Sequence, residues 1–182
     1  MKSWATAFIL ALATLAASTA NAQNFVEFEA DGAVSAKSRY EIPFDSTETD
    51  GAFLYIQAMR DWVQAYGGFF YRPERAQWFK FSMGFGMESR QAKIRFAIMA
   101  GVEKERLSSF TVYEGQEGGE DWWYKHETTF NIVGPLSAGI ISQRHVGTGP
   151  LVSFDLPHKF SLSGGIGVGS GVHPVVSLQK KF

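Results

Sequence analysis

The ten residues WFKFSMGFGM, positions 78–87, decide the fold because apolar side chains alternate along them with small or polar ones. Successive side chains of a β-strand point to opposite faces, so every second residue shares a face. One face would carry Phe79, Phe81, Met83, Phe85 and Met87. The other would carry Trp78, Lys80, Ser82, Gly84 and Gly86. The stretch is therefore predicted to be a strand with one strongly apolar face.

The same two-residue period returns along the chain. It is clear in AKIRFAIMAGV at 92–102, in LSGGIGVG at 162–169 and in VVSLQKKF at 175–182. Glycines in the second of these stretches follow the period as well. The dozen or so residues left after them are too few for the helix and acidic ribose partner of a dinucleotide-binding loop. All three stretches are predicted to be strands.

Composition indicates an all-β chain. The 182 residues include 16 Phe, 6 Tyr and 5 Trp, which strands favour, together with 19 Gly. The formal net charge of −1 gives no support for nucleic-acid binding, and the absence of cysteine excludes a disulfide framework. After the N-terminal leader no apolar run reaches about twenty residues, which excludes a helical membrane protein.

Residues 1–22 are predicted to be a secretory signal peptide. Lys2 precedes an apolar run that leads to the small-residue cleavage site Ala20-Asn21-Ala22. The expected domains are a signal peptide at 1–22 and one β-barrel domain at 23–182.

Alternation alone fits a soluble barrel with its apolar face inward or a membrane barrel with that face toward lipid. The membrane is favoured because the polar faces are rich in Gly and Ser, as in a confined lumen. The segments also approach the roughly nine to eleven residues of a membrane-crossing strand. Aromatic residues gather at the expected strand ends, as in interfacial girdles. These are Trp62, Trp78, Trp122, Trp123, Tyr124, Phe160 and Phe182.

An antiparallel up-and-down transmembrane β-barrel of about ten strands is therefore predicted. The strands are expected at 24–34, 50–59, 63–73, 77–89, 92–104, 123–133, 136–147, 149–156, 159–169 and 174–182. Long links at 35–49 and 105–122 would be surface loops, and the short links would face the periplasm together with both termini. The stretch at 51–68 also fits one face of a short helix, which leaves an eight-stranded barrel as the alternative.

With its leader, its alternating strands and its final segment VVSLQKKF, the chain resembles the small bacterial outer-membrane β-barrels. The resemblance is one of pattern over the whole chain. It implies an outer-membrane location, contact with outer-membrane lipid and lipopolysaccharide, and recognition of Val176, Leu178 and Phe182 by the barrel-assembly machinery. Lys180 departs from the pattern because that lipid-face position is usually apolar. Its long stem can carry the charge to the interface.

Charged residues between the apolar positions are predicted to point into the lumen. They are Glu27, Glu29, Asp31, Lys80, Lys93, Arg95, Lys125, Glu127, Asp155 and Lys181. Charges confined in a narrow lumen are costly unless they are paired and hydrogen-bonded. We therefore expect a plugged, ion-paired core and no open channel.

The sequence predicts no catalytic residue, metal site or cofactor. Ser142 and His145 are three positions apart and His126 and Glu127 are adjacent, so each pair would diverge to opposite faces of a strand. The acidic residues of the long links lack the spacing of a calcium loop.

Three functions stay open, and the first is preferred. It is a non-enzymatic barrel whose loops at 35–49 and 105–122 meet lipopolysaccharide, another cell or a partner. The second is an enzyme that acts on lipid A or another envelope lipid. The third is a narrow pore or carrier for small hydrophobic molecules.

Overall fold

The computed structural model describes residues 25–31, 34–59, 62–73, 78–89, 93–119 and 121–182. The predicted signal peptide at 1–22 lies outside these residues. Within them, no helix has the length and apolar character needed to cross a membrane.

The described residues form twelve strands and one short 3-10 helix. The strands are β1 (Phe25–Ala30), β2 (Val34–Pro43), β3 (Asp50–Met59), β4 (Val63–Tyr71), β5 (Phe79–Glu88), β6 (Ile94–Lys104), β7 (Leu107–Gln116), β8 (Trp123–Val133), β9 (Leu136–Gln143), β10 (Gly147–Leu156), β11 (Phe160–Val168) and β12 (Val172–Lys181). The helix, η2, spans Pro157–Lys159.

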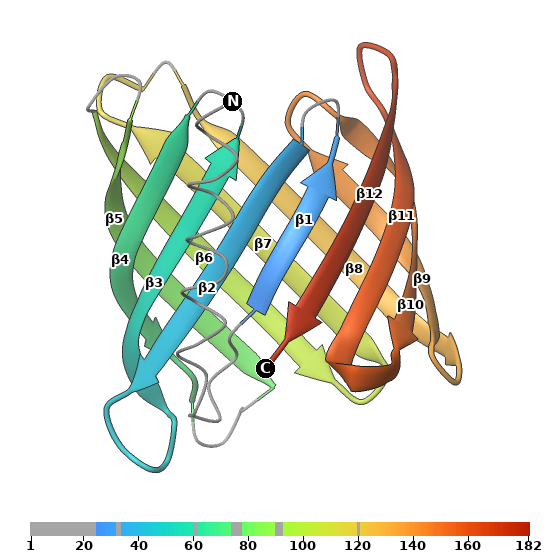
Figure 1. The fold of residues 1–182 in the computed structure, drawn as a ribbon, viewed down its shortest axis with the longest axis horizontal. Helices are drawn as coiled ribbons and strands as arrows, with labels where there is room; N and C mark the ends of the chain where they lie inside the picture. The colour runs from blue at the N-terminus through green and yellow to red at the C-terminus, as the bar shows by residue number, and fades with distance from the viewer. Residues whose placement is uncertain (1–24, 32–33, 60–61, 74–77, 90–92, 120) are drawn as a thin grey trace.

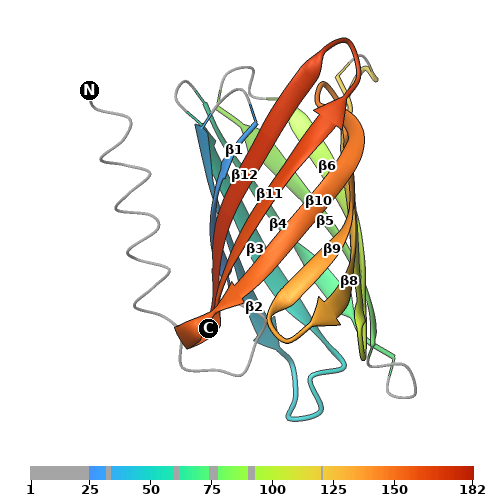
Figure 2. The same ribbon diagram turned by 90° about the vertical axis from the view of Figure 1, so that its right-hand side faces the viewer.

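Every strand pairs antiparallel with its sequence neighbours, and β1 also pairs with β12 to close a barrel of tilted strands (Figures 1 and 2). In the closing pair Phe25 lies opposite Lys181, and Ala30 lies opposite Val176. The start of β1 and the end of β12 therefore share one end of the barrel. We call this end the terminal rim and the opposite end the far rim.

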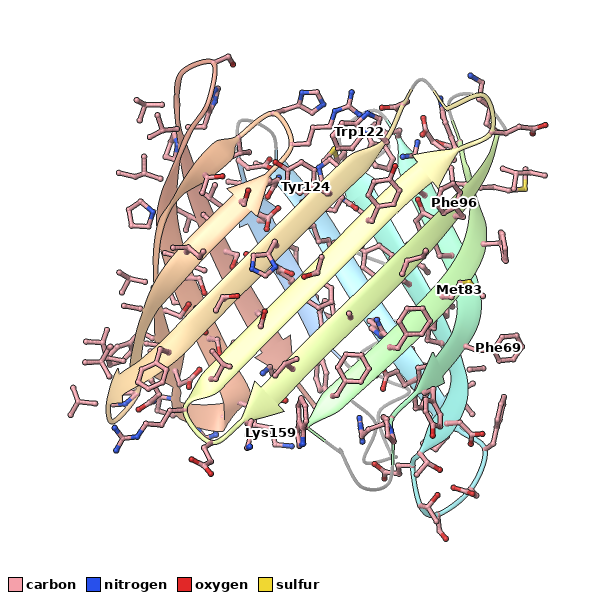
Figure 3. All side chains as sticks on the ribbon, turned by 180° about the vertical axis from the view of Figure 1, so that it is seen from behind. Phe69, Met83, Phe96, Trp122, Tyr124 and Lys159 are labelled. Atoms are coloured by element: carbon pink, nitrogen blue, oxygen red, sulfur yellow. The ribbon has the colours of Figure 1, made fainter. Side chains whose placement is uncertain are left out.

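Polar side chains are buried inside this barrel and apolar ones are exposed outside it. On β5, Phe85 is 62% exposed whereas Ser82 is 1% exposed. Figure 3 shows the side chain of Phe69 projecting away from the wall. Buried charged residues include Glu29, Lys37, Arg39, Glu41, Arg95, Glu114 and Lys125. The distribution is the reverse of that in a water-soluble protein, where charged side chains are almost never fully buried unless paired.

The predicted all-β antiparallel barrel is confirmed, but the counts of ten and eight strands are both wrong. The two additional strands, β2 and β7, lie within the links at 35–49 and 105–122 that the sequence analysis assigned to surface loops. The middle of each outward face is weakly apolar: Ala36 and Ser38 lie between Val34 and Ile42 on β2, and Ser109 and Thr111 lie between Leu107 and Tyr113 on β7. Because the period carried little hydrophobic contrast there, alternation did not reveal these strands.

The doubtful stretch at 51–68 contains strand residues of β3 and β4 and no helix among those described. Finding β2 and β7 also changes which rim each link occupies. The link at 44–49 lies at the terminal rim, not at the opposite rim as predicted, and the link around Ser89 lies at the far rim. In the former link Asp45 accepts hydrogen bonds from the backbone N and Oγ1 of Thr47, which lower the pKa of its carboxyl.

A cation on the outer wall tests which face meets lipid. Ile98 and Ile94 share the outward face of β6, Ile98 near mid-strand and Ile94 at the far-rim end. Ile98→Arg should lower the free energy of unfolding in lipid vesicles by about 2–4 kcal/mol, and Ile94→Arg by about 0–1 kcal/mol. Urea titration followed by tryptophan fluorescence measures both. Equal losses would contradict a bilayer centred on the barrel wall.

Close packing around the inward glycines gives a second test. A Cβ at Gly167 would lie 2.5 Å from Val146 Cγ1 and 2.6 Å from Val146 O, whereas a Cβ at Gly164 on the outward face of β11 would meet nothing within 4 Å. Gly167→Leu should therefore destabilise the barrel by about 1–3 kcal/mol through overpacking. Gly164→Leu is the matched control and should leave the midpoint of the urea transition nearly unchanged. A Gly167→Leu protein as stable as the unaltered one would show that the neighbouring atoms can move to make room for the new side chain.

Candidate functional site

A buried ion cluster crosses the lumen between β1, β2 and β8. Lys37 Nζ is 2.7 Å from Glu29 Oε1, and Lys125 Nζ donates a hydrogen bond to the other oxygen of Glu29. Lys125 Nζ is also 2.9 Å from Glu127 Oε1 and 3.8 Å from Glu27 Oε1. The Lys125 side chain is 5% exposed. Cations and carboxylates therefore compensate one another where water is largely excluded.

A second cluster lies toward the terminal rim. Arg39 Nε is 2.7 Å from Glu41 Oε1, and Lys80 Nζ donates to the same oxygen. Arg39 Nη2 donates to Ser82 Oγ over 2.7 Å. The Arg39 guanidinium stacks 4.6 Å from the centre of the Phe53 ring, on the same inward face of the barrel. Two cations thus converge on the same carboxylate oxygen of Glu41.

A third cluster lies in the lumen toward the far rim, on the adjacent strands β4 to β7. Tyr66 is fully buried (0% exposed), and its hydroxyl donates to Glu114 Oε2 over 3.1 Å. Arg95 Nε donates to the Tyr66 oxygen over 3.0 Å, and Arg95 Nη1 is 2.7 Å from Glu88 Oε2. Gln64 donates to Glu114 over 3.1 Å. Tyr66 also packs with Phe53, Phe70, Ala97, Met99 and Val112.

A cavity of about 490 Å³ occupies the lumen on the terminal side of this cluster. Residues of the terminal rim such as Phe25 and Phe182 line it, and so do Arg39 and Lys125 deeper in the barrel. Its cationic lining residues are Lys37, Arg39, Arg72, Lys80, Lys125, Lys159 and Lys181. Its acidic ones are Glu27, Glu41, Glu103 and Glu127. Among the described lining residues, cationic side chains outnumber acidic ones, and Figure 3 shows Lys159 at the terminal end of the barrel.

The remaining charges predicted for the lumen lie near the rims. Asp31 accepts a hydrogen bond from Gln143 Nε2, and Asp155 accepts one from Ser161 Oγ over 2.6 Å. Lys181 Nζ is 3.9 Å from Glu103 Oε1, with both side chains more than half exposed. Lys93 is exposed and precedes β6.

Sequence reasoning missed Lys37, Arg39, Glu41 and Glu114, although these are among the most buried charges. They belong to β2 and β7, the strands that were taken for loops. The available signal was weak but present: Lys37, Arg39 and Glu41 occupy alternate positions, as residues on one face of a strand do.

The proposed assembly residues lie on or beside β12. Val176 and Leu178 are exposed on its outward face, 52% and 39%, and Phe182 follows its last residue. Lys180 shares that face, and its Nζ lies 5.0 Å from the ring centres of both Phe160 and Phe182. Two aromatic faces therefore hold this cation at the terminal rim.

No three His, Cys, Asp or Glu residues in the described part of the chain gather closely enough to hold a metal ion.

Comparison with known proteins gives a likeness of fold. No family model and no curated protein sequence matches the chain. Two structures of a KdgM porin, one of them in complex with disordered oligogalacturonate, each match with a TM-score of 0.57 and 12% identity. Each match covers 88% of this chain and 99% of the porin. A protein from work on in-meso crystallization of membrane proteins matches with a TM-score of 0.62, 10% identity and coverage of 88% and 83%. The resemblance to outer-membrane β-barrels is thus confirmed at the level of fold.

Removing the central cation tests the first ion cluster. Lys125→Met removes the ammonium group that the carboxylates of Glu27, Glu29 and Glu127 surround. Removing one partner of a buried ion pair costs about 3–5 kcal/mol. We expect that loss in the free energy of unfolding in lipid vesicles. Lys181→Met is the control, because its exposed pair with Glu103 should contribute only about 0–1 kcal/mol. Similar losses in the two variants would refute the compensating role of Lys125.

Proposed function

We propose that this chain is an integral outer-membrane β-barrel with a plugged polar lumen and surfaces for envelope or ligand interaction. The observation that carries the proposal is the inverted distribution of side chains. Apolar residues such as Phe69 and Phe85 are exposed over the wall, and ion pairs such as Lys125 with Glu29 are buried inside. Only a lipid environment makes the exposed apolar wall favourable. The porin likeness supports the same location.

The plug is the far-rim cluster of Arg95, Tyr66, Gln64 and Glu114. Its side chains hydrogen-bond to one another from β4, β6 and β7 on the inner face, and buried hydrophobic side chains pack against Tyr66. Opening a passage there means separating buried charges from their partners, which is costly. The barrel is therefore a closed vessel with a cationic vestibule at the terminal rim.

In our proposal both termini face the periplasm, as an even number of strands allows. The leader carries the chain across the inner membrane, and Val176, Leu178 and Phe182 present it to the barrel-assembly machinery. The far rim then meets lipopolysaccharide at the cell surface. Its aromatic cluster of Tyr113, Trp122 and Tyr124 supports this arrangement, because stacked rings of this kind belong to membrane interfaces.

The cationic cavity favours a second candidate function, passage or capture of a small anionic solute. Among the described residues that line the cavity, cationic side chains outnumber acidic ones, and Arg39 and Lys80 are two of them. The porin neighbour has been seen with oligogalacturonate. A lining of this charge favours anions over the small hydrophobic molecules that a lipid carrier would take.

A heat-modifiable gel shift tests the membrane barrel itself. Protein folded in detergent should migrate differently before and after boiling, because a closed barrel resists unfolding by the gel detergent until it is heated. Fractionation of cells that express the full chain should place it in the outer membrane. Unchanged migration together with a soluble fraction would overturn the membrane assignment.

Conductance in planar bilayers tests the plug. The unaltered barrel should show no steady open level. Tyr66→Ala removes the central hydroxyl and ring and should produce one, whereas Tyr71→Ala, on the exposed face of the same strand, should not. A steady conductance in the unaltered protein, blocked by a small polyanion, would contradict the plug and establish the second candidate.

A further inference from the structure

An arginine lies on the outer wall at the far rim, beside the aromatic cluster. The backbone N of Arg144 donates to the carbonyl oxygen of Tyr124, which continues the pairing of β9 with β8 beyond Gln143. Gln143 is buried in the lumen, so Arg144, which follows it, faces outward. The guanidinium lies 4.4 Å from the centre of the Trp122 ring, which stacks on Tyr124 with ring centres 5.7 Å apart. Figure 3 shows Trp122 and Tyr124 at the end of the barrel opposite Lys159.

The charge of Arg144 is only partly compensated. Its Nη1 is 3.7 Å from Asp121 Oδ1, and the Asp121 side chain is 56% exposed. The other oxygen of Asp121 is 3.5 Å from Nη1 of Arg95 in the plug, so two arginines share this carboxylate. In the described part of the chain Asp121 is the only carboxylate within 4 Å of the Arg144 guanidinium. Nη1 of Arg144 is buried, so a second anion would meet its other guanidinium nitrogens.

A pair of hydroxyl groups lies one level deeper on the same outward face. Ser142 is two positions before Arg144 on β9 and lies opposite Thr148 of β10. Their oxygens are 2.7 Å apart, and neither has a second hydrogen-bond partner among the described residues. Two hydroxyls carry two hydrogens, and the bond between them uses one, so one donor is left facing lipid. Two residues of a strand tilted by about 45° descend about 5 Å, which gives the depth of the pair below Arg144.

This order of groups matches the headgroup of a phosphorylated lipid. Arginine pairs well with phosphate because its N–H groups form charge-assisted hydrogen bonds with phosphate oxygens. The spare hydroxyl donor needs an acceptor, and hydrocarbon chains have none. In a phosphorylated lipid the carbonyl oxygens that join the acyl chains lie below the phosphate, just as the hydroxyl pair lies below Arg144. Cation, donor and depth therefore fit one lipid molecule lying against the wall.

We propose that Arg144 binds a phosphate group of lipid A, and that the pair of Ser142 and Thr148 donates a hydrogen bond to an acyl carbonyl of the same molecule. The proposal rests on the proposed membrane barrel with its far rim at the cell surface, because lipid A belongs to that leaflet. Trp122 positions the guanidinium through its ring face. Asp121 competes with the phosphate for the same guanidinium.

The test titrates the full-length barrel, folded in detergent, with lipid A and measures the dissociation constant by native mass spectrometry. EDTA is present, so that no divalent cation bridges the phosphate to acidic residues of the rim. Arg144→Gln should raise the dissociation constant about tenfold or more, the scale of a lost hydrogen bond to a charged group. Asp121→Asn should lower it about two- to fivefold, because it removes the competing carboxylate.

The matched control is Lys180→Gln. Lys180 also lies on the outward face beside aromatic rings, those of Phe160 and Phe182, but at the terminal rim. Its replacement should leave the dissociation constant for lipid A within about twofold. Trp122→Phe keeps an aromatic face for the guanidinium and should retain binding, whereas Trp122→Ala should weaken it.

Three lipids identify the group that is bound: lipid A, lipid A without its phosphates, and phosphatidylglycerol. Lipid A without phosphates should bind the unaltered barrel about as weakly as lipid A binds Arg144→Gln, and Arg144→Gln should weaken it no further. The double variant Ser142→Ala with Thr148→Val removes the donors and should weaken both forms of lipid A alike. Phosphatidylglycerol should bind more weakly than lipid A.

Three results would overturn the proposal. They are equal affinity for lipid A with and without phosphates, equal effects of Arg144→Gln and Lys180→Gln, and binding of phosphatidylglycerol at least as tight as that of lipid A. The gel shift is measured on the same samples. A barrel that shifts but does not bind lipid A contradicts this site alone, whereas the absence of a shift contradicts the proposed membrane barrel.

Discussion

The pairing of β1 with β12 is the constraint on which the rest of this structure depends. It brings Phe25 opposite Lys181 and leaves no unpaired sheet edge. In hydrocarbon each unpaired backbone group costs several kcal/mol, so a sheet can cross a membrane only when it closes. Closure also separates two solvents, lipid outside and a confined polar space inside. Each strand therefore needs one apolar face and one face that can be satisfied by hydrogen bonds or ion pairs.

The inner face meets this demand with buried ion pairs and hydrogen bonds. Lys125 and Lys37 compensate Glu29 near the middle, Arg95 and Tyr66 hold Glu114 toward the far rim, and a cavity lies toward the terminal rim. Small inward residues such as Gly167 leave room where neighbouring side chains approach. In the proposed function the cluster at the far rim is the plug, and the cavity at the terminal rim is its vestibule.

The predictability of this fold varied with the contrast between the two faces of each strand. β5 and β6 have Phe, Ile and Met on one face and small or charged residues on the other, so their existence and facing could be predicted from sequence. β2 carries Lys37, Arg39 and Glu41 on its inward face, and the middle of its outward face has only Ala36 and Ser38. The sequence analysis therefore took this strand for a polar loop. Because β2 and β7 were taken for loops, the sequence analysis did not place Lys37, Arg39, Glu41 and Glu114 in the lumen. Which charges meet across the lumen depends on strand register and barrel closure, and local alternation determines neither.

One run of polar residues in β8 belongs to two clusters on opposite sides of the barrel wall. Lys125 and Glu127 belong to the lumen cluster, whereas His126 and Thr128, between and beyond them, face the bilayer. A polar group in lipid is tolerated only when its hydrogen bonds are made, and the bonds from Thr128 to His126 and from His126 to Thr111 provide this. Apolar residues at these positions would contact lipid without needing hydrogen-bond partners. The hydrogen bonds that His126 makes with Thr111 and Thr128 offset the cost of placing these polar groups in lipid, so the outer wall tolerates them at mid-strand depth.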